Sequence, residues 1–137
     1  MSAESSKRPS YRTLGNSQLK VSPLCVGAMM FGDQTDEPVA REIVAHARDH
    51  GVNFIDTADV YSTGKSESMV GAVIESQRDD WVLATKVGNK MSDKPNESRY
   101  SRTWVLRECD ASLKRLATDW IDIYYLHRDF PGTSLEE

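Results

Sequence analysis

The sequence has only two cysteines in 137 residues, no excess of basic over acidic side chains, and no long hydrophobic run. Cys25 and Cys109 are far apart in apolar surroundings, so we expect buried thiols in a reducing cytoplasm rather than a disulfide. The net charge of −4 and the isoelectric point near 5.4 argue against nucleic acid or an anionic membrane as partner. No signal peptide or membrane-spanning segment is apparent.

Two common functional signatures are also missing. The chain has no G-x-G-x-x-G phosphate loop, which excludes a Rossmann-type dinucleotide site. It has no His-x-His pair or clustered carboxylates, so we expect no metal; a site built from Asp56, Asp59 and His127 is the weaker alternative. No short repeat or low-complexity linker divides the chain, and its 39% hydrophobic and 28% charged residues are ordinary for a globular protein.

Short apolar runs alternate with amphipathic segments along the chain. Residues 1–10 are polar and patternless, and we expect a flexible tail there. Residues 11–21 (YRTLGNSQLKV) predict a β-hairpin. Buried strands are expected at residues 24–27, 52–55, 81–85 and 120–126, and helices are expected to begin at Asp36, Ser66 and Ser101. Strands that alternate with helices predict right-handed crossovers and a parallel sheet covered on both faces.

Helical periodicity predicts the residues that face the core. In the first helix, which Gly51 closes, these are Val39, Ile43, Val44 and Ala47. In the second they are Met69, Val70, Val73 and Ile74, and in the third Val105, Cys109, Leu113 and Leu116. The aromatic residues expected to serve in packing are Trp104, Trp120, Tyr124 and Tyr125. At residues 135–137, where the sequence ends, a further crossover helix is expected to begin.

Polar side chains follow three successive predicted strands. Asp56, Lys86 and His127 each stand at a strand end, and parallel strands bring such ends to one rim, as in an α/β barrel. Tyr61 lies on the loop after Asp56. Taken singly, these residues have ordinary explanations as a helix cap, an exposed lysine and a structural histidine. Together they predict a general acid: an ammonium beside Tyr61 favours the phenolate, Asp56 holds Lys86, and His127 orients a substrate oxygen.

The chain resembles the aldo-keto reductases from residue 11 to its last residue. The motifs that carry the resemblance are YRTLGNSQLKVSPLCVG, GVNFIDTADVYSTGKSE, LATKVG, SLKRLATDWIDIYYLHRDF and TSLEE. The resemblance implies an α/β fold of the TIM type, a (β/α)8 barrel with a hairpin closing its bottom. Residues 11–137 would form the N-terminal half of that barrel, an incomplete domain with the hairpin and about four β/α units.

The resemblance implies a catalytic tetrad of Asp56, Tyr61, Lys86 and His127, all present. It implies reversible hydride transfer between NADPH and a small-molecule aldehyde or ketone, without metal, with Tyr61 as proton donor. The residues that match the nicotinamide-binding positions of the family are Gly27, Ala28, Met29 and Asp56. Phe31 is expected to form a wall of the substrate pocket.

The sequence departs from the family in length. A full member is roughly twice as long, and the part not represented here supplies most contacts to the adenosine and its 2′-phosphate. A second hypothesis is therefore a non-catalytic module, such as the barrel-fold accessory subunits of ion channels that resemble these enzymes, or an inactive fragment. A half-barrel would also leave open strand edges at residues 24–27 and 120–126, so we expect self-association through them.

Overall fold

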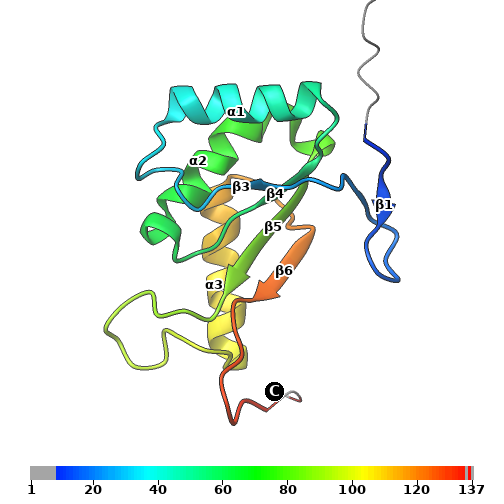
Figure 1. Ribbon diagram of the computed structural model, residues 1–137. Helices are drawn as coiled ribbons and strands as arrows, with labels where there is room; N and C mark the ends of the chain where they lie inside the picture. The colour runs from blue at the N-terminus through cyan, green and yellow to red at the C-terminus, as the bar shows by residue number, and fades with distance from the viewer. Residues whose placement is uncertain (1–8, 135, 137) are drawn as a thin grey trace, which may run out of the picture.

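A parallel sheet of four strands, in the order β3-β4-β5-β6, organises the chain in this computed structural model, which describes residues 9–134 and 136 (Figure 1). The strands are β1 (Arg12–Thr13), β2 (Lys20–Val21), β3 (Val26–Gly27), β4 (Phe54–Asp56), β5 (Val82–Val87) and β6 (Ile123–Leu126). The α-helices are α1 (Glu37–Asp49), α2 (Lys65–Ile74) and α3 (Arg102–Leu116), and the 3₁₀ helices are η1 (Tyr61–Gly64) and η2 (Glu75–Asp80). Residues 1–8 of the expected tail, and most of the helix expected at 135–137, lie outside the described residues.

The predicted alternation of strands and helices is confirmed. Each neighbouring pair in the sheet is parallel, and a helix lies in each connection from β3 to β4, from β4 to β5 and from β5 to β6. The three helices pack in chain order, α1 on α2 and α2 on α3, and cover the same face of the sheet, so the prediction of a sheet covered on both faces was wrong for the part of the chain that the structure describes (Figure 1). Because all four strands run in one direction, their C-terminal ends meet at one edge, where Gly27 pairs with Asp56 and Lys86 with Tyr125.

The expected hairpin is present and lies at the opposite end of the sheet. Strands β1 and β2 pair antiparallel, with Arg12 opposite Val21. Asn53, just before β4, holds the hairpin to the sheet: its side-chain amide donates to the Lys20 carbonyl at 2.9 Å and accepts from the Ser22 amide at 2.7 Å. This contact places the hairpin beside the N-terminal ends of the strands, away from the edge that carries Asp56 and Lys86.

Two of the three predicted helix caps are confirmed. The Asp36 carboxylate accepts from the Val39 amide and the Ser101 hydroxyl accepts from the Trp104 amide, each satisfying an amide that the first helical turn leaves free. The prediction that Ser66 caps the second helix was wrong. Gly64, with a left-handed backbone (φ 87°), precedes α2, and Ser66 is buried inside its first turn.

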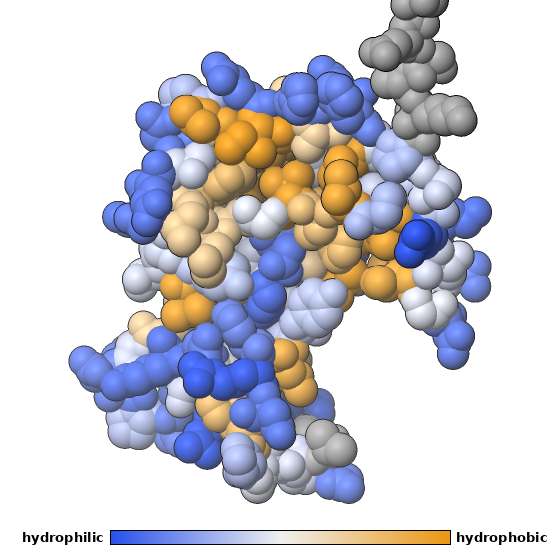
Figure 2. Space-filling model, in the orientation of Figure 1, coloured by the Kyte–Doolittle hydropathy of each residue, from blue (hydrophilic) through white to orange (hydrophobic). Residues whose placement is uncertain are grey.

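The core lies between the sheet and the helices. Its fully buried members include Ile55, Leu83, Val44, Val70, Ile74 and Leu116. The predicted face of α2 is confirmed, since Val70, Val73 and Ile74 are buried and the partly buried Met69 packs against them. The prediction for the inward face of α1 was partly wrong. Ala40 and Val44 point inward, whereas Val39 and Ile43 are 47% and 41% exposed. Figure 2 shows hydrophobic side chains gathered on the surface over α1.

Helix α3 buries a different stripe from the one predicted. Trp104, Glu108, Ser112 and Leu116 are buried, and only Leu116 belonged to the expected apolar face. Glu108 and Ser112 are hydrogen-bonded to Arg115 of the same helix, which compensates the cost of burying them. Paired polar side chains thus take part in the inward face, while the other expected residues, Val105, Cys109 and Leu113, are half-buried.

Other burial predictions also need correction. Leu24 is 67% exposed and Cys25 is exposed, so the strand expected at residues 24–27 is only Val26–Gly27. Both cysteines are free, as expected, but neither thiol is fully buried. Trp120 is partly exposed, with the Arg78 guanidinium 4.2 Å from its ring centre.

No helix within residues 9–134 is long and apolar enough to cross a membrane.

Gly71 permits the close approach of α2 and α3. A Cβ atom at this position would lie 2.3 Å from the carbonyl oxygen of Leu116, a backbone atom that cannot move aside cheaply. We predict that Gly71→Ala lowers the free energy of unfolding by about 1–3 kcal/mol, although alanine is the better helix former. Chemical denaturation measures the change. Gly27→Ala is the control, because its Cβ would meet no atom within 4 Å; equal stability of both variants would contradict this account of the helix contact.

Candidate active site

The four residues predicted to form a catalytic site come together at one edge of the sheet. Asp56 is the last residue of β4, Lys86 is the penultimate residue of β5, and His127 directly follows β6. Tyr61 opens η1, which the loop after β4 folds back over this edge. The strand expected to end before Lys86 thus continues through it.

The Lys86 ammonium group is the centre of the arrangement. Its Nζ donates to Asp56 Oδ2 at 2.6 Å, to the carbonyl oxygen of Thr57 at 2.8 Å and to the Tyr61 hydroxyl oxygen at 3.1 Å. An ammonium has three hydrogens, so these three acceptors account for all of them. Because the Tyr61 oxygen accepts from Lys86, its own O–H remains available as a donor toward the open side of the sheet.

The backbone after Tyr61 is strained. Ser62 and Thr63 adopt left-handed conformations with φ of 49° and 53°, which cost non-glycine residues about 1–2 kcal/mol each. The turn is held by hydrogen bonds from the Tyr61 amide to the Ala58 carbonyl and from the Thr63 amide to the Val60 carbonyl. Strain of this kind persists only where the surroundings determine the conformation, and here it follows directly after Tyr61.

His127 faces Tyr61 edge-on, with 5.6 Å between the ring centres. Its backbone amide donates to the Val87 carbonyl at 2.8 Å, which continues the pairing of β6 with β5 beyond the strand end. Burial, and then the positive charge of Lys86, lower the pKa of the imidazole below its ordinary value. The ring is therefore neutral near pH 7, with one nitrogen carrying a proton and the other not.

The residues predicted to contact a nicotinamide border the same edge. Gly27 pairs with Asp56, and the space where its side chain would be is open. Ala28 is fully buried, and its amide donates to the Asp56 carbonyl at 2.9 Å. Met29 is exposed and lines an open hollow together with Tyr61. A flat ring fits the open face at Gly27, so the residues present are compatible with the nicotinamide end of a cofactor.

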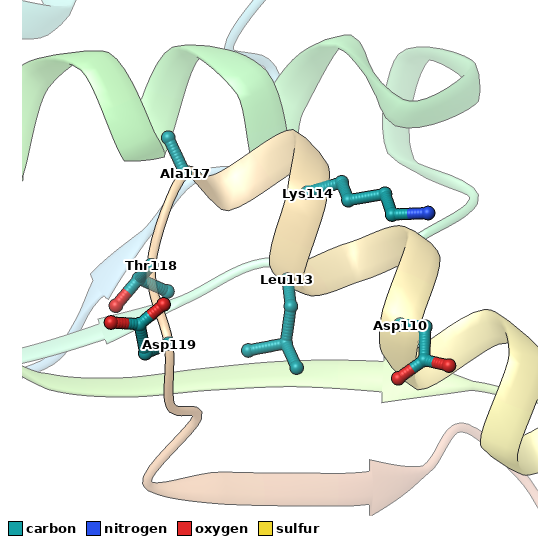
Figure 3. A pocket seen from close by; sticks show the side chains of 6 residues that line it. All are labelled: Asp110, Leu113, Lys114, Ala117, Thr118 and Asp119. Atoms are coloured by element: carbon teal, nitrogen blue, oxygen red, sulfur yellow. The ribbon is translucent and has the colours of Figure 1, made fainter.

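Phe31 does not line this edge, contrary to expectation. It is 3% exposed and belongs to the hydrophobic core with Ala28 and Val70. A second surface hollow, seen in Figure 3, lies at the C-terminal end of α3 and is lined by Asp110, Leu113, Lys114, Ala117, Thr118 and Asp119. Asp119 precedes β6 whereas His127 follows it, so this hollow is at the other end of the sheet from the tetrad.

Sequence reasoning missed a layer of buried polar groups between the site and the helices. Thr57, Asp59, Ser66, Glu67 and Thr85 are all fully buried. Asp59 is the unusual member, because within the described chain neither of its carboxylate oxygens has a hydrogen-bond partner. The available signal was the pair Ser66 and Glu67, polar residues near the start of an otherwise apolar helical face.

The alternative metal site required Asp59 to lie together with Asp56 and His127, and the structure does not bring these three side chains together. Burial, followed by the negative charges of Glu108 and Glu67, raises the pKa of Asp59 to about 7. Its electrostatic neighbours are thus on the helices, whereas Asp56 is bonded to Lys86. Among the described residues, no three histidine, cysteine, aspartate or glutamate side chains are placed to hold a metal ion.

Comparison with known proteins gives a consistent result. The sequence profile of the Aldo/keto reductase family matches residues 23–137. The chain is 42% identical to a probable voltage-gated potassium channel subunit beta of Arabidopsis thaliana, with 93% of this chain and 40% of that protein covered. It is 40% identical to an uncharacterized oxidoreductase of Bacillus subtilis, with 85% of this chain and 38% of that protein covered.

Solved structures show the same relationship. The holo form of an aldo-keto reductase from Bacillus halodurans superimposes with a TM-score of 0.75 at 40% identity, covering 86% of this chain and 40% of that one. Such neighbours are (β/α)8 barrels, and the parallel sheet described above corresponds to part of one. The chain spans about 40% of the length of the curated relatives it matches.

The raised pKa of Asp59 has a consequence for stability. An exposed aspartate has a pKa of about 3.9, so between about pH 4 and the folded value of about 7 the folded chain retains a proton that the unfolded chain has lost. The free energy of unfolding should therefore fall as pH rises through this interval, by at most about 1.4 kcal/mol per pH unit. We predict that Asp59→Asn removes this contribution. Denaturation at a series of pH values measures it.

The exposed Asp80 supplies the control for this measurement. Asp80→Asn should leave the pH dependence of stability close to that of the parent chain. If Asp59→Asn had the same pH dependence as the parent chain, Asp59 would be ionised throughout and its assignment as a buried neutral acid would be wrong.

Proposed function

The chain belongs to the aldo/keto reductase family, and on this premise we propose that it supplies the catalytic side chains of an NADPH-dependent oxidoreductase that reduces aldehydes or ketones to alcohols. The observation that carries the proposal is the Lys86 ammonium, which joins the Asp56 carboxylate and the Tyr61 hydroxyl at the strand ends. Because the Tyr61 oxygen accepts from Lys86, its position is fixed and its O–H is free to donate to a substrate oxygen.

In the proposed reaction, Tyr61 donates its hydroxyl proton to the carbonyl oxygen of the substrate. When bound, the nicotinamide supplies the hydride that the carbonyl carbon receives, so that the carbonyl becomes an alcohol. Lys86 stabilises the phenolate that Tyr61 becomes, and Asp56 holds the Lys86 ammonium directed at it. His127, neutral near pH 7, donates a hydrogen bond to the same carbonyl oxygen and orients it.

The proposed cofactor contacts are Gly27, Ala28, Met29 and Asp56. Gly27 offers an open surface beside Asp56, and Met29 is exposed at the adjoining hollow. These residues would hold the nicotinamide end.

We place the protein in the cytoplasm, because its two free cysteines, one of them exposed, remain thiols in a reducing compartment.

A second candidate function is favoured by one observation. The relative that shares 42% identity is named as a probable potassium channel beta subunit, so a non-catalytic accessory role is the alternative. The tetrad argues for the enzyme, since an accessory subunit has no chemical need for a lysine bonded to both an aspartate and a tyrosine. Carbonyl-dependent oxidation of NADPH by the protein would separate the two.

The Tyr61 hydroxyl is the proposed proton donor, and its removal tests the mechanism. In a protein where this chain is part of a complete barrel, we predict that Tyr61→Phe lowers the rate of carbonyl reduction by about 10²–10⁴-fold. Binding of NADPH should change little, because the ring remains. Initial rates and fluorescence titration with NADPH measure the two effects. Tyr11→Phe, at an exposed tyrosine of the hairpin region, is the control; near-normal turnover of the Tyr61 variant would remove it from this role.

The edges of the sheet lead to a prediction about the 137-residue chain by itself. Within residues 9–134, strands β3 and β6 each have one unpaired side, and Leu24, Tyr125 and Leu126 are exposed near them. Unpaired apolar strands associate with other chains. We predict that the chain self-associates as its concentration rises and binds NADPH weakly. Light scattering across a dilution series and nucleotide titration test both expectations; a monomer at all concentrations with tight NADPH binding would contradict them.

A further inference from the structure

The first turn of α2 is bonded to three strands directly beneath the tetrad. The side chains involved are Thr57 after β4, Thr85 in β5, and Ser66 and Glu67 in α2, and all four are fully buried. Helix starts in such a fold ordinarily contact a sheet through apolar side chains. Here the contacts are hydrogen bonds, which are directional and therefore set distances as well as filling space.

Ser66 connects the ends of β3 and β4. Its hydroxyl donates to the Ala28 carbonyl at 2.6 Å and lies 2.7 Å from the Thr57 hydroxyl. A serine hydroxyl has one hydrogen, which the Ala28 bond uses, so the Thr57 hydroxyl must donate to Ser66. The result is a chain of two bonds in one direction, from Thr57 through Ser66 to the Ala28 carbonyl.

Glu67 connects β5 to the helices. Thr85 donates its hydroxyl hydrogen to Glu67 Oε1 at 2.6 Å, and Arg115 Nε donates to Glu67 Oε2 at 2.5 Å. Arg115 also donates to Glu108, so α3 supplies the positive charge that allows Glu67 to remain buried. Both carboxylate oxygens are therefore bonded, and the position of Glu67 is determined from two sides.

The residues held in this way are the chain neighbours of Asp56 and Lys86. Successive residues of a strand point to opposite faces, so Thr57 and Thr85 point to the helices while Asp56 and Lys86 point to the open face. Thr57 is also a direct partner, because its carbonyl accepts from the Lys86 ammonium at 2.8 Å. A displacement of Thr57 therefore changes one of the three bonds that orient Lys86.

We propose that Ser66 and Glu67 are positioning residues for the tetrad: by holding Thr57 and Thr85 they set the spacing of β4 and β5 at the level of Asp56 and Lys86. The proposal rests on the function proposed above. It concerns groups that touch neither substrate nor cofactor and that act through the backbone of their two partners. A displacement of about 1 Å at a reacting group can lower a rate about 10²-fold. A change in the spacing of β4 and β5 beside Asp56 and Lys86 should therefore change the reaction rate measurably.

Thr57→Val is the primary test, because valine keeps the branched shape and deletes only the hydroxyl, while the Ser66 bond to Ala28 remains possible. In a protein where this chain is part of a complete barrel, we expect kcat for carbonyl reduction to fall at least about tenfold, with KM for NADPH changed by less than about threefold. The pH dependence of kcat should also shift, because the orientation of Lys86 changes. Thr57→Ser keeps the hydroxyl and should restore most of the rate.

Ser68→Ala is the matched control. Ser68 is exposed and lies on α2, the helix that carries Ser66 and Glu67. Among the described residues, its hydroxyl bonds only to the Gly64 carbonyl. It should leave kcat and its pH dependence unchanged. A folded Thr57→Val protein with parental kcat and pH dependence but reduced thermal stability would show that the hydroxyl is merely structural, and would overturn the proposal.

Hydrogen exchange supplies a readout that needs no activity. The Thr57 amide donates to the Ala84 carbonyl and the Asp59 amide to the Lys86 carbonyl, so both bonds report the β4–β5 spacing at this level. In Thr57→Val and Thr85→Val these two amides should exchange faster, while the amide of Val44 in α1 should not. Exchange unchanged at both amides would refute the spacing role.

The two readouts separate this proposal from the proposed function. If the parent protein reduced no carbonyl compound but both variants showed the local change in exchange, the reductase function would fail and the spacing role of Ser66 and Glu67 would stand. If the parent protein were active and Tyr61→Phe inactive, but neither hydroxyl variant altered kcat or exchange, the function would stand and this inference would fail.

A double-mutant cycle between Thr57→Val and Ser66→Ala should show coupling, since one bond joins them.

Discussion

The ion pair between Lys86 and Asp56 is the interaction on which the site depends. A lysine pointing into the concave side of a sheet is costly unless its charge is compensated, and here one carboxylate, one carbonyl and one hydroxyl oxygen satisfy it. The same three bonds give the ammonium a single orientation. Tyr61 is thereby aligned by a group that is itself fixed, which is the preorganisation that electrostatic catalysis requires.

A second set of charges supports the first from the opposite side of the sheet. Arg115 pairs with Glu67 and Glu108, and Asp59 lies close to this group, where burial and the nearby carboxylates raise its pKa to about 7. Three ionised carboxylates between the sheet and the helices would repel one another, and Arg115 carries a single positive charge to compensate them. The raised pKa of Asp59 reduces this repulsion, and the close approach of α2 and α3 around the group depends on Gly71.

Much of this organisation could be predicted from the sequence. The hairpin, the order of strands and helices, and the positions of Asp56, Lys86 and His127 at strand ends all follow from local patterns, because the period of apolar residues and the helix caps are local properties. Burial was predicted less well. Val39, Ile43 and Leu24 are apolar yet exposed, and Ser66 and Glu67 are polar yet buried. Hydrophobicity describes a preference of each residue, whereas burial depends on which other elements cover it.

The sequence by itself determined the class of fold and the chemical groups available at one edge of the sheet. It could do so because parallel strands bring residues at their C-terminal ends together whatever the remaining details. Only the tertiary structure decided that the Lys86 ammonium reaches three acceptors, that Tyr61 is held by a strained turn, and that Thr57 and Thr85 are bonded to α2. Apart from the turn, whose own bonds are local, these features join residues between 9 and 30 positions apart through single hydrogen bonds. No local pattern in a sequence records a bond of that kind.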